Sequence, residues 1–142
     1  MKFTDCEEPL SEEQISSAER EMGLRFPQSL REHYLRANGG YPEPYIYEDD
    51  NVDTAVQACL PLRRGKGSAI DVYEDHVLSK AFVPRHLFPF ARDPGGDNFY
   101  VDTLSPLGMV YLYRHDVGTG EEPLVALNVG IDEFWSRLKP DE

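Results

Sequence analysis

The sequence predicts an α+β domain with a mainly antiparallel sheet, flanked by an amino-terminal helix pair, a middle helix and a carboxy-terminal helix. Helix signals occur near both ends of the chain and once in its middle, whereas the second half carries short β-rich runs between glycines and prolines. That order of elements is typical of the α+β class. With 142 residues, of which 40% are hydrophobic, the chain can bury a core of its own, and we expect residues 1–142 to form a single domain.

Two helices are predicted near the amino terminus. Ser11 and Gln14 have the spacing of a capping box, and Gly23 supplies the left-handed residue that ends the first helix. A second helix begins at Pro27, whose fixed φ suits a first helical turn. The Asn-Gly-Gly sequence at 38–40 is expected to end it, since these residues tolerate the positive φ of a helix exit.

The remaining elements follow from spacing and composition. Residues 54–62 are strand-like, and the apolar residues of 70–82 have helical rather than alternating spacing. A strand meander follows, with expected strands at 87–91, 98–102, 109–113 and 124–127. The chain closes with a helix from about Ile131 to Leu138, whose first turn carries two acids that suit the helix dipole.

Charge is the strongest global signal. The chain has 26 Asp and Glu against 14 Lys and Arg, a net charge of -12. Such a field repels nucleic acid and anionic membranes and attracts a basic protein, although acidic surfaces also simply keep cytosolic proteins in solution. We therefore expect neither nucleic acid nor a membrane among the partners. The acidic first ten residues and the lack of a long apolar run predict a cytoplasmic protein.

No catalytic, metal or cofactor motif is evident. The histidines do not have the spacing that places two imidazoles on one helical face, and we expect each to be on the surface or hydrogen-bonded. Cys6 and Cys59 are expected to be reduced thiols. The glycine-rich segment 65–68 lacks the order of a phosphate-binding loop. The sequence thus predicts a protein that is not an enzyme and holds no metal or cofactor.

The segment 41–53 is the first candidate site, and we expect it to be an exposed loop or edge strand. It combines tyrosines with a cluster of acids, and a surface that binds a basic protein uses aromatic area for affinity and charge for association rate. A solvated acidic loop would have the same composition. The candidate partner-binding residues are Tyr45, Tyr47, Glu48, Asp49, Asp50 and Asp53.

The second candidate is the turn at 93–97, with sequence Asp-Pro-Gly-Gly-Asp. Proline followed by glycine predicts a type II turn, in which Asp93 and Asp97 accept hydrogen bonds from turn amides. A ligand site at Gly95, Gly96 and Asp97 is the alternative. A calcium loop is disfavoured, because the Pro-Gly-Gly sequence interrupts the alternating oxygen ligands that such a loop needs.

Four segments, in order along most of the chain, resemble the SUKH superfamily in its SMI/KNR-like branch. They are 23–40, with its Phe-Pro and Asn-Gly-Gly elements, 88–102, with its Gly-Gly-Asp element, 108–116 and 131–138. Gly130 departs from the pattern, because a serine cap is expected there. The acidic segment 41–53 matches none of these motifs.

The resemblance implies an SMI/KNR-like α+β fold without a catalytic site. Bacterial members are commonly immunity proteins that bind and neutralise toxins, many of them nucleases, and a fungal relative regulates cell-wall synthesis. We therefore expect an immunity protein for a cognate, basic toxin domain of a contact-dependent or polymorphic toxin system. The alternative is a regulatory protein-interaction or small-ligand-binding module of the same fold. The sequence says nothing about oligomeric state.

Overall fold

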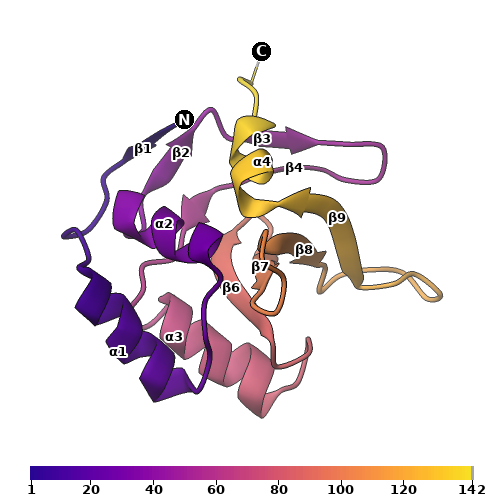
Figure 1. Ribbon diagram of the computed structural model, residues 1–142. Coiled ribbons are helices and arrows are strands. Elements are labelled where there is room, and N and C mark those ends of the chain that lie inside the picture. The colour runs from indigo at the N-terminus through magenta and orange to yellow at the C-terminus, as the bar shows by residue number, and fades with distance from the viewer. Residues whose placement is uncertain (142) are drawn as a thin grey trace.

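The computed structural model describes residues 1–141, and a five-stranded antiparallel sheet lies at its centre (Figure 1). The strands are β5 (Ala58–Cys59), β6 (Leu87–Arg92), β7 (Asn98–Asp102), β8 (Met109–Tyr113) and β9 (Leu124–Gly130). Each strand pairs with the next one along the chain. The predicted α+β class and strand meander are therefore confirmed.

Two small sheets flank the central one. β1 (Lys2–Thr4) pairs with β2 (Tyr41–Glu43), and β3 (Ile46–Glu48) forms a hairpin with β4 (Asp53–Ala55). The strand expected at 54–62 is thus divided between β4 and β5. The carboxy-terminal tail extends the hairpin, because Ile46 and Lys139 exchange backbone hydrogen bonds of 3.1 and 2.9 Å.

The helices are α1 (Glu12–Met22), α2 (Gln28–Arg36), α3 (Ala69–Val72), which continues as the π-helix η1 (Tyr73–Ser79), and α4 (Ile131–Ser136). The capping box of Ser11 and Gln14 is present, and Gly23 ends α1 at φ +71°. Pro27 is the residue before α2 rather than its first. The expected exit through the glycines is wrong, because Ala37 already ends α2 in an extended conformation.

Asn38 has a different role from the one expected. Its side-chain amide donates to the Glu8 carbonyl at 2.9 Å, and its oxygen accepts from the Leu62 amide at 3.0 Å. Asn38 is buried, so its side chain supplies the hydrogen bonds that these two backbone groups cannot obtain from water. The residue therefore ties the amino-terminal segment to the chain that follows β5.

An aromatic core lies between α2, α4 and the central sheet. His33 of α2 is 1% exposed and stacks on Trp135 of α4 with ring centroids 5.2 Å apart. Neither ring nitrogen of His33 has a hydrogen-bond partner in the described chain. Burial, and secondarily the charge of Arg36, lowers the pKa of His33 to about 3. The expectation of a surface or hydrogen-bonded histidine is wrong here.

Gly130 lies directly before α4, and its neighbours explain why no serine cap stands there. A Cβ atom at this position would lie 2.6 Å from the Leu107 carbonyl oxygen. The Ile131 amide donates to that same oxygen at 3.3 Å. The loop between β7 and β8 therefore occupies the space that any side chain at 130 would need, and it satisfies one amide of the helix start.

Candidate functional site

The β3–β4 hairpin carries most of the predicted partner-binding residues, and Asp49 stabilises its turn. One carboxylate oxygen of Asp49 accepts from the amides of Asn51 and Val52 at 2.7 and 2.8 Å. The other accepts from the Tyr47 hydroxyl at 2.6 Å. Partial burial acts to raise the pKa of Asp49, but these three hydrogen bonds outweigh it and hold the pKa below its usual value. The Asp49 carboxylate is thus already engaged within the chain.

Tyr47 is fully buried, which corrects the expectation that the whole segment is exposed. Its ring stacks on Phe134 with centroids 5.3 Å apart. Alternation along β3 turns this side chain towards the core, while its neighbours face outwards. Burial, together with the bond to Asp49, raises the pKa of the Tyr47 hydroxyl. A partner could reach this ring only by opening the hairpin.

The other acids of the hairpin differ in availability. Glu48 forms an ion pair with Lys139, and this contact raises the pKa of Lys139. Asp50 and Asp53 are exposed, and within residues 1–141 neither is in an ion pair. The free negative charge of the hairpin is therefore concentrated on Asp50 and Asp53.

Tyr45 lies beside a groove of about 310 Å³, which we call the tyrosine groove. Tyr45 is 39% exposed and Tyr41 is 47% exposed. The Tyr45 hydroxyl donates to the Asp141 carboxylate at 3.2 Å, which raises the pKa of the tyrosine. The groove is lined by Tyr41, Pro42, Glu43, Tyr45, Ala55, Val56, Gln57 and Pro94. Sequence reasoning missed Tyr41, although this tyrosine opens the same acidic segment.

The turn at 93–97 is held by its own side chains. Asp93 accepts from the amides of Gly95 and Asp97, each at 2.9 Å, and from the Thr54 hydroxyl at 3.0 Å. Gly96, and not Gly95, has a positive φ of +94°, so the predicted type II turn is wrong. The Gly96 amide donates to the Asp93 carbonyl, and the left-handed residue follows that turn.

Asp97 serves the neighbouring strand connection rather than the turn amides. Its carboxylate accepts from the His115 amide at 3.0 Å and also contacts the His115 ring. This contact raises the pKa of His115. Within residues 1–141, no group of three or more histidine, cysteine or acidic side chains is arranged to hold a metal ion.

The two predicted candidate sites lie against each other. The bond from Thr54 to Asp93 joins β4 to the turn at 93–97. Pro94 of the turn and Tyr45 of the hairpin line the same groove. The structure therefore brings together residues from two segments that sequence reasoning had treated separately.

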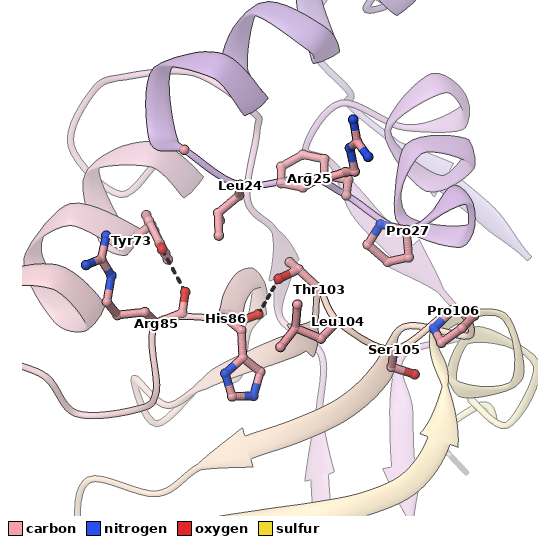
Figure 2. Close-up of a pocket in the computed structure, with 12 residues that line it drawn as sticks. Leu24, Arg25, Pro27, Tyr73, Arg85, His86, Thr103, Leu104, Ser105 and Pro106 are labelled. Atoms are coloured by element: carbon pink, nitrogen blue, oxygen red, sulfur yellow. Dashed lines mark hydrogen bonds between the residues drawn. The ribbon is translucent and has the colours of Figure 1, made fainter.

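A second concavity, of about 550 Å³, lies on other elements, and we call it the Leu104 cleft (Figure 2). Its walls come from the α1–α2 connection, from Arg85 and His86 before β6, and from the loop after β7. Leu104 in that loop is 78% exposed. The sequence offered little signal for this cleft, because its walls come from three distant segments.

Polar groups at the base of the Leu104 cleft are paired with one another. The Tyr73 hydroxyl donates to the Arg85 carbonyl at 2.7 Å, and the Thr103 hydroxyl donates to the His86 carbonyl at 2.7 Å (Figure 2). These bonds join η1 and the loop after β7 to the segment before β6. They also leave the interior of the cleft mainly apolar, with Leu24, Phe26, Pro27, Leu104 and Pro106 among its lining residues.

Comparison with known proteins gives one family. A family model described as the SMI1 / KNR4 family (SUKH-1) matches residues 9–134. The match runs from just before α1 into α4, and so includes the hairpin, the turn at 93–97 and the central sheet. Comparisons with curated proteins and with solved structures gave no match. Among the helices of residues 1–141, none is both long enough and apolar enough to cross a membrane.

Proposed function

The chain belongs to the SMI1 / KNR4 family (SUKH-1), and from this membership we propose that it is a cytoplasmic immunity protein that binds and neutralises a cognate, basic toxin domain. The SUKH family is known for immunity-type proteins and is generally non-enzymatic. The toxin domain would be one of a contact-dependent or polymorphic toxin system, such as a nuclease. The observation that carries the proposal is the tyrosine groove beside the acidic hairpin.

The tyrosine groove has the chemistry to hold a basic side chain. The half-exposed rings of Tyr41 and Tyr45 offer aromatic faces, which attract a Lys or Arg cation. The carboxylate of Glu43 lines the groove, and that of Asp141 is hydrogen-bonded to Tyr45. A basic side chain entering the groove would therefore meet both aromatic surface and negative charge.

The surrounding charge favours rapid association. The net charge of -12 attracts a basic domain from a distance. Asp50 and Asp53, which have no ion pair among the described residues, add local charge on the hairpin. A nuclease binds the phosphates of its substrate with basic side chains. An acidic protein that occupies those side chains prevents the substrate from binding, and this is the neutralising step that we propose.

The alternative of a small-ligand site at Gly95, Gly96 and Asp97 has weaker support. The carboxylates of both Asp93 and Asp97 are already engaged within the chain. The tyrosine groove would also suit the other alternative, a regulatory module that binds a protein other than a toxin. Loss of a toxin's activity on binding distinguishes these two functions.

The test is binding to the toxin domain encoded by the adjacent reading frame, measured as an association rate over a range of salt concentrations. Asp50→Asn with Asp53→Asn should slow association about threefold to tenfold and reduce its salt dependence. Tyr45→Ala should instead speed dissociation. The matched control, Glu8→Gln with Glu32→Gln, removes the same charge at exposed, unpaired positions elsewhere and should change both rates little.

Two results would overturn the proposal. A complex in which the toxin keeps its full activity would exclude neutralisation. Equal association rates for the hairpin variant and its control, with unchanged dissociation of Tyr45→Ala, would exclude the tyrosine groove as the contact surface.

A further inference from the structure

The Leu104 cleft is a second surface whose charge is opposite to that of the chain as a whole. We propose that it docks an acidic segment of a protein partner, with an apolar side chain of that segment in the cleft and its carboxylates on Arg25 and Arg85. Both arginines are exposed and line the cleft. Figure 2 shows their guanidinium groups on opposite sides of it.

The charges of the two arginines that line the cleft are available to a ligand. Neither Arg25 nor Arg85 is in an ion pair in the part of the chain that the structure describes. Five other arginines are paired with acids: Arg20 with Glu13, Arg31 with Glu12, Arg63 with Glu7, Arg64 with Glu74 and Arg137 with Glu133. Among the described residues Arg36, Arg92 and Arg114 are also outside any ion pair, but they do not line this cleft. Acids outnumber basic residues 26 to 14, so two unpaired guanidinium groups at one cleft form a local site for carboxylates.

The interior of the cleft selects an apolar side chain. Leu104 is 78% exposed, although it is a large apolar residue. It lies across the cleft from Leu24 and Pro27 of the α1–α2 connection (Figure 2). The hydroxyls of Tyr73 and Thr103 at the base already donate to backbone carbonyls. A polar group placed there would lose its hydrogen bonds to water and would find both hydroxyl donors already used. An apolar group would instead cover Leu104 and remove its surface from water.

Charge also identifies the occupant as a segment of another protein. A second copy of this chain carries the same net charge of -12 and is repelled. A nucleic acid would meet the same field and only two free arginines at the cleft. The field of the chain disfavours any strongly acidic partner, so the occupant is a short segment whose few carboxylates lie close to the two guanidinium groups, where local attraction outweighs the screened long-range repulsion. Carboxylates on both sides of an apolar residue would reach both arginines while that residue fills the space between them.

This site is independent of the proposed toxin-binding surface. The Leu104 cleft and the tyrosine groove have no lining residue in common. They also select opposite charges. A result at one site therefore leaves the other proposal standing.

The test uses a fluorescein-labelled peptide, Asp-Glu-Leu-Phe-Glu-Asp, titrated at low salt into the full chain, with fluorescence polarisation and amide chemical shifts as readouts. We expect binding, with the largest shifts at Leu24, Arg25 and Leu104. A peptide with Ser-Ser in place of Leu-Phe, and a basic peptide, Lys-Arg-Leu-Phe-Arg-Lys, should bind at least about tenfold more weakly at the cleft.

Variants of the protein provide the matched control. Arg25→Glu with Arg85→Glu should weaken binding of the acidic peptide about tenfold. Arg36→Glu with Lys66→Glu changes the net charge equally at exposed positions outside the cleft and should weaken it less than about threefold. Leu104→Ser should weaken it without changing the charge. The amide spectra of these surface variants report whether each remains folded.

Several outcomes would overturn this proposal. They are no binding at millimolar peptide, shifts confined to residues away from the cleft, equal binding of the basic peptide at the cleft, and equal loss in the two charge-reversed variants. Concentration-dependent shifts at the cleft without peptide would assign it to a second copy of this chain instead.

Discussion

The β3–β4 hairpin and the Leu104 cleft differ in where their charged groups find partners. In the hairpin, Asp49 binds Tyr47 and the turn amides, and Glu48 binds Lys139. In the cleft, Arg25 and Arg85 have no ion pair among the described residues. The hairpin is conspicuous in the sequence, and yet much of its charge serves its own fold. The cleft is inconspicuous, and yet its charges are free for a ligand.

This difference shows that the density of one residue type does not measure how many of those residues a partner can reach. A hairpin turn needs acceptors for its amides, and an aspartate supplies them. A long arginine at the rim of a cleft keeps its charge in water unless a carboxylate is nearby. The tests below separate residues that hold the structure from residues that face a partner.

The largest effect should come from truncating the buried tyrosine of the hairpin. Tyr47→Ala removes a ring that is fully buried against Phe134 and should lower the free energy of unfolding by about 3–5 kcal/mol. Tyr45→Ala, at the half-exposed neighbouring tyrosine, should lower it by only about 1 kcal/mol. Denaturant unfolding of both variants measures the difference. Similar losses of unfolding free energy in the two variants would contradict the assignment of Tyr47 to the core and of Tyr45 to the surface.

Sequence reasoning found the parts of the fold that have local signals. The capping box at Ser11 and the strands at 98–102 and 109–113 were predicted correctly, because caps and alternation act over a few residues. The strand β1 was missed. It is three residues long and pairs Phe3 with Pro42, a partner far along the chain, so no local pattern indicates it.

The candidate sites show the same limit. The segment 41–53 was expected to be an exposed loop or edge strand, but Tyr47 is buried because β3 pairs with β4 and turns this side chain inwards, which no local pattern indicated. Asp93 was correctly expected to bind turn amides, which are its near neighbours. The Leu104 cleft needs three distant segments to meet, and His33 is buried only because α4 brings Trp135 against it.

The next effect concerns pH. Lowering the pH protonates the acids of the hairpin and leaves the arginines of the cleft charged, but it also destabilises the fold through His33. The pKa of His33 is about 3 in the folded chain and 6.5 ordinarily, so between these two pH values His33 binds a proton in the unfolded chain and not in the folded chain. The contribution of neutral His33 to stability is complete above pH 6.5 and is lost as the pH falls, by about 1.4 kcal/mol per unit towards the folded pKa.

By about pH 4 this loss should reach about 3 kcal/mol. Denaturant unfolding at a series of pH values measures it, and His33→Phe should remove this part of the slope while keeping a ring in the core. The pKa of His115 is raised by Asp97, so that its contribution is complete below the usual pKa and is lost as the pH rises through the raised value. An unchanged acid slope in His33→Phe would show that His33 does not stay neutral in the folded chain.

The smallest of the three effects separates two adjacent acids. Asp49→Ala removes the acceptor for the Tyr47 hydroxyl and for the amides of Asn51 and Val52, and should lower the free energy of unfolding by about 2 kcal/mol. Asp50→Ala removes the same charge from an exposed side chain and should change it by less than about 0.5 kcal/mol. Toxin association should give the reverse order, because Asp50 faces solvent and Asp49 faces its own turn. If Asp49→Ala instead left stability unchanged and slowed association as much as Asp50→Ala, the hairpin would be a binding surface throughout, and its contrast with the Leu104 cleft would be lost.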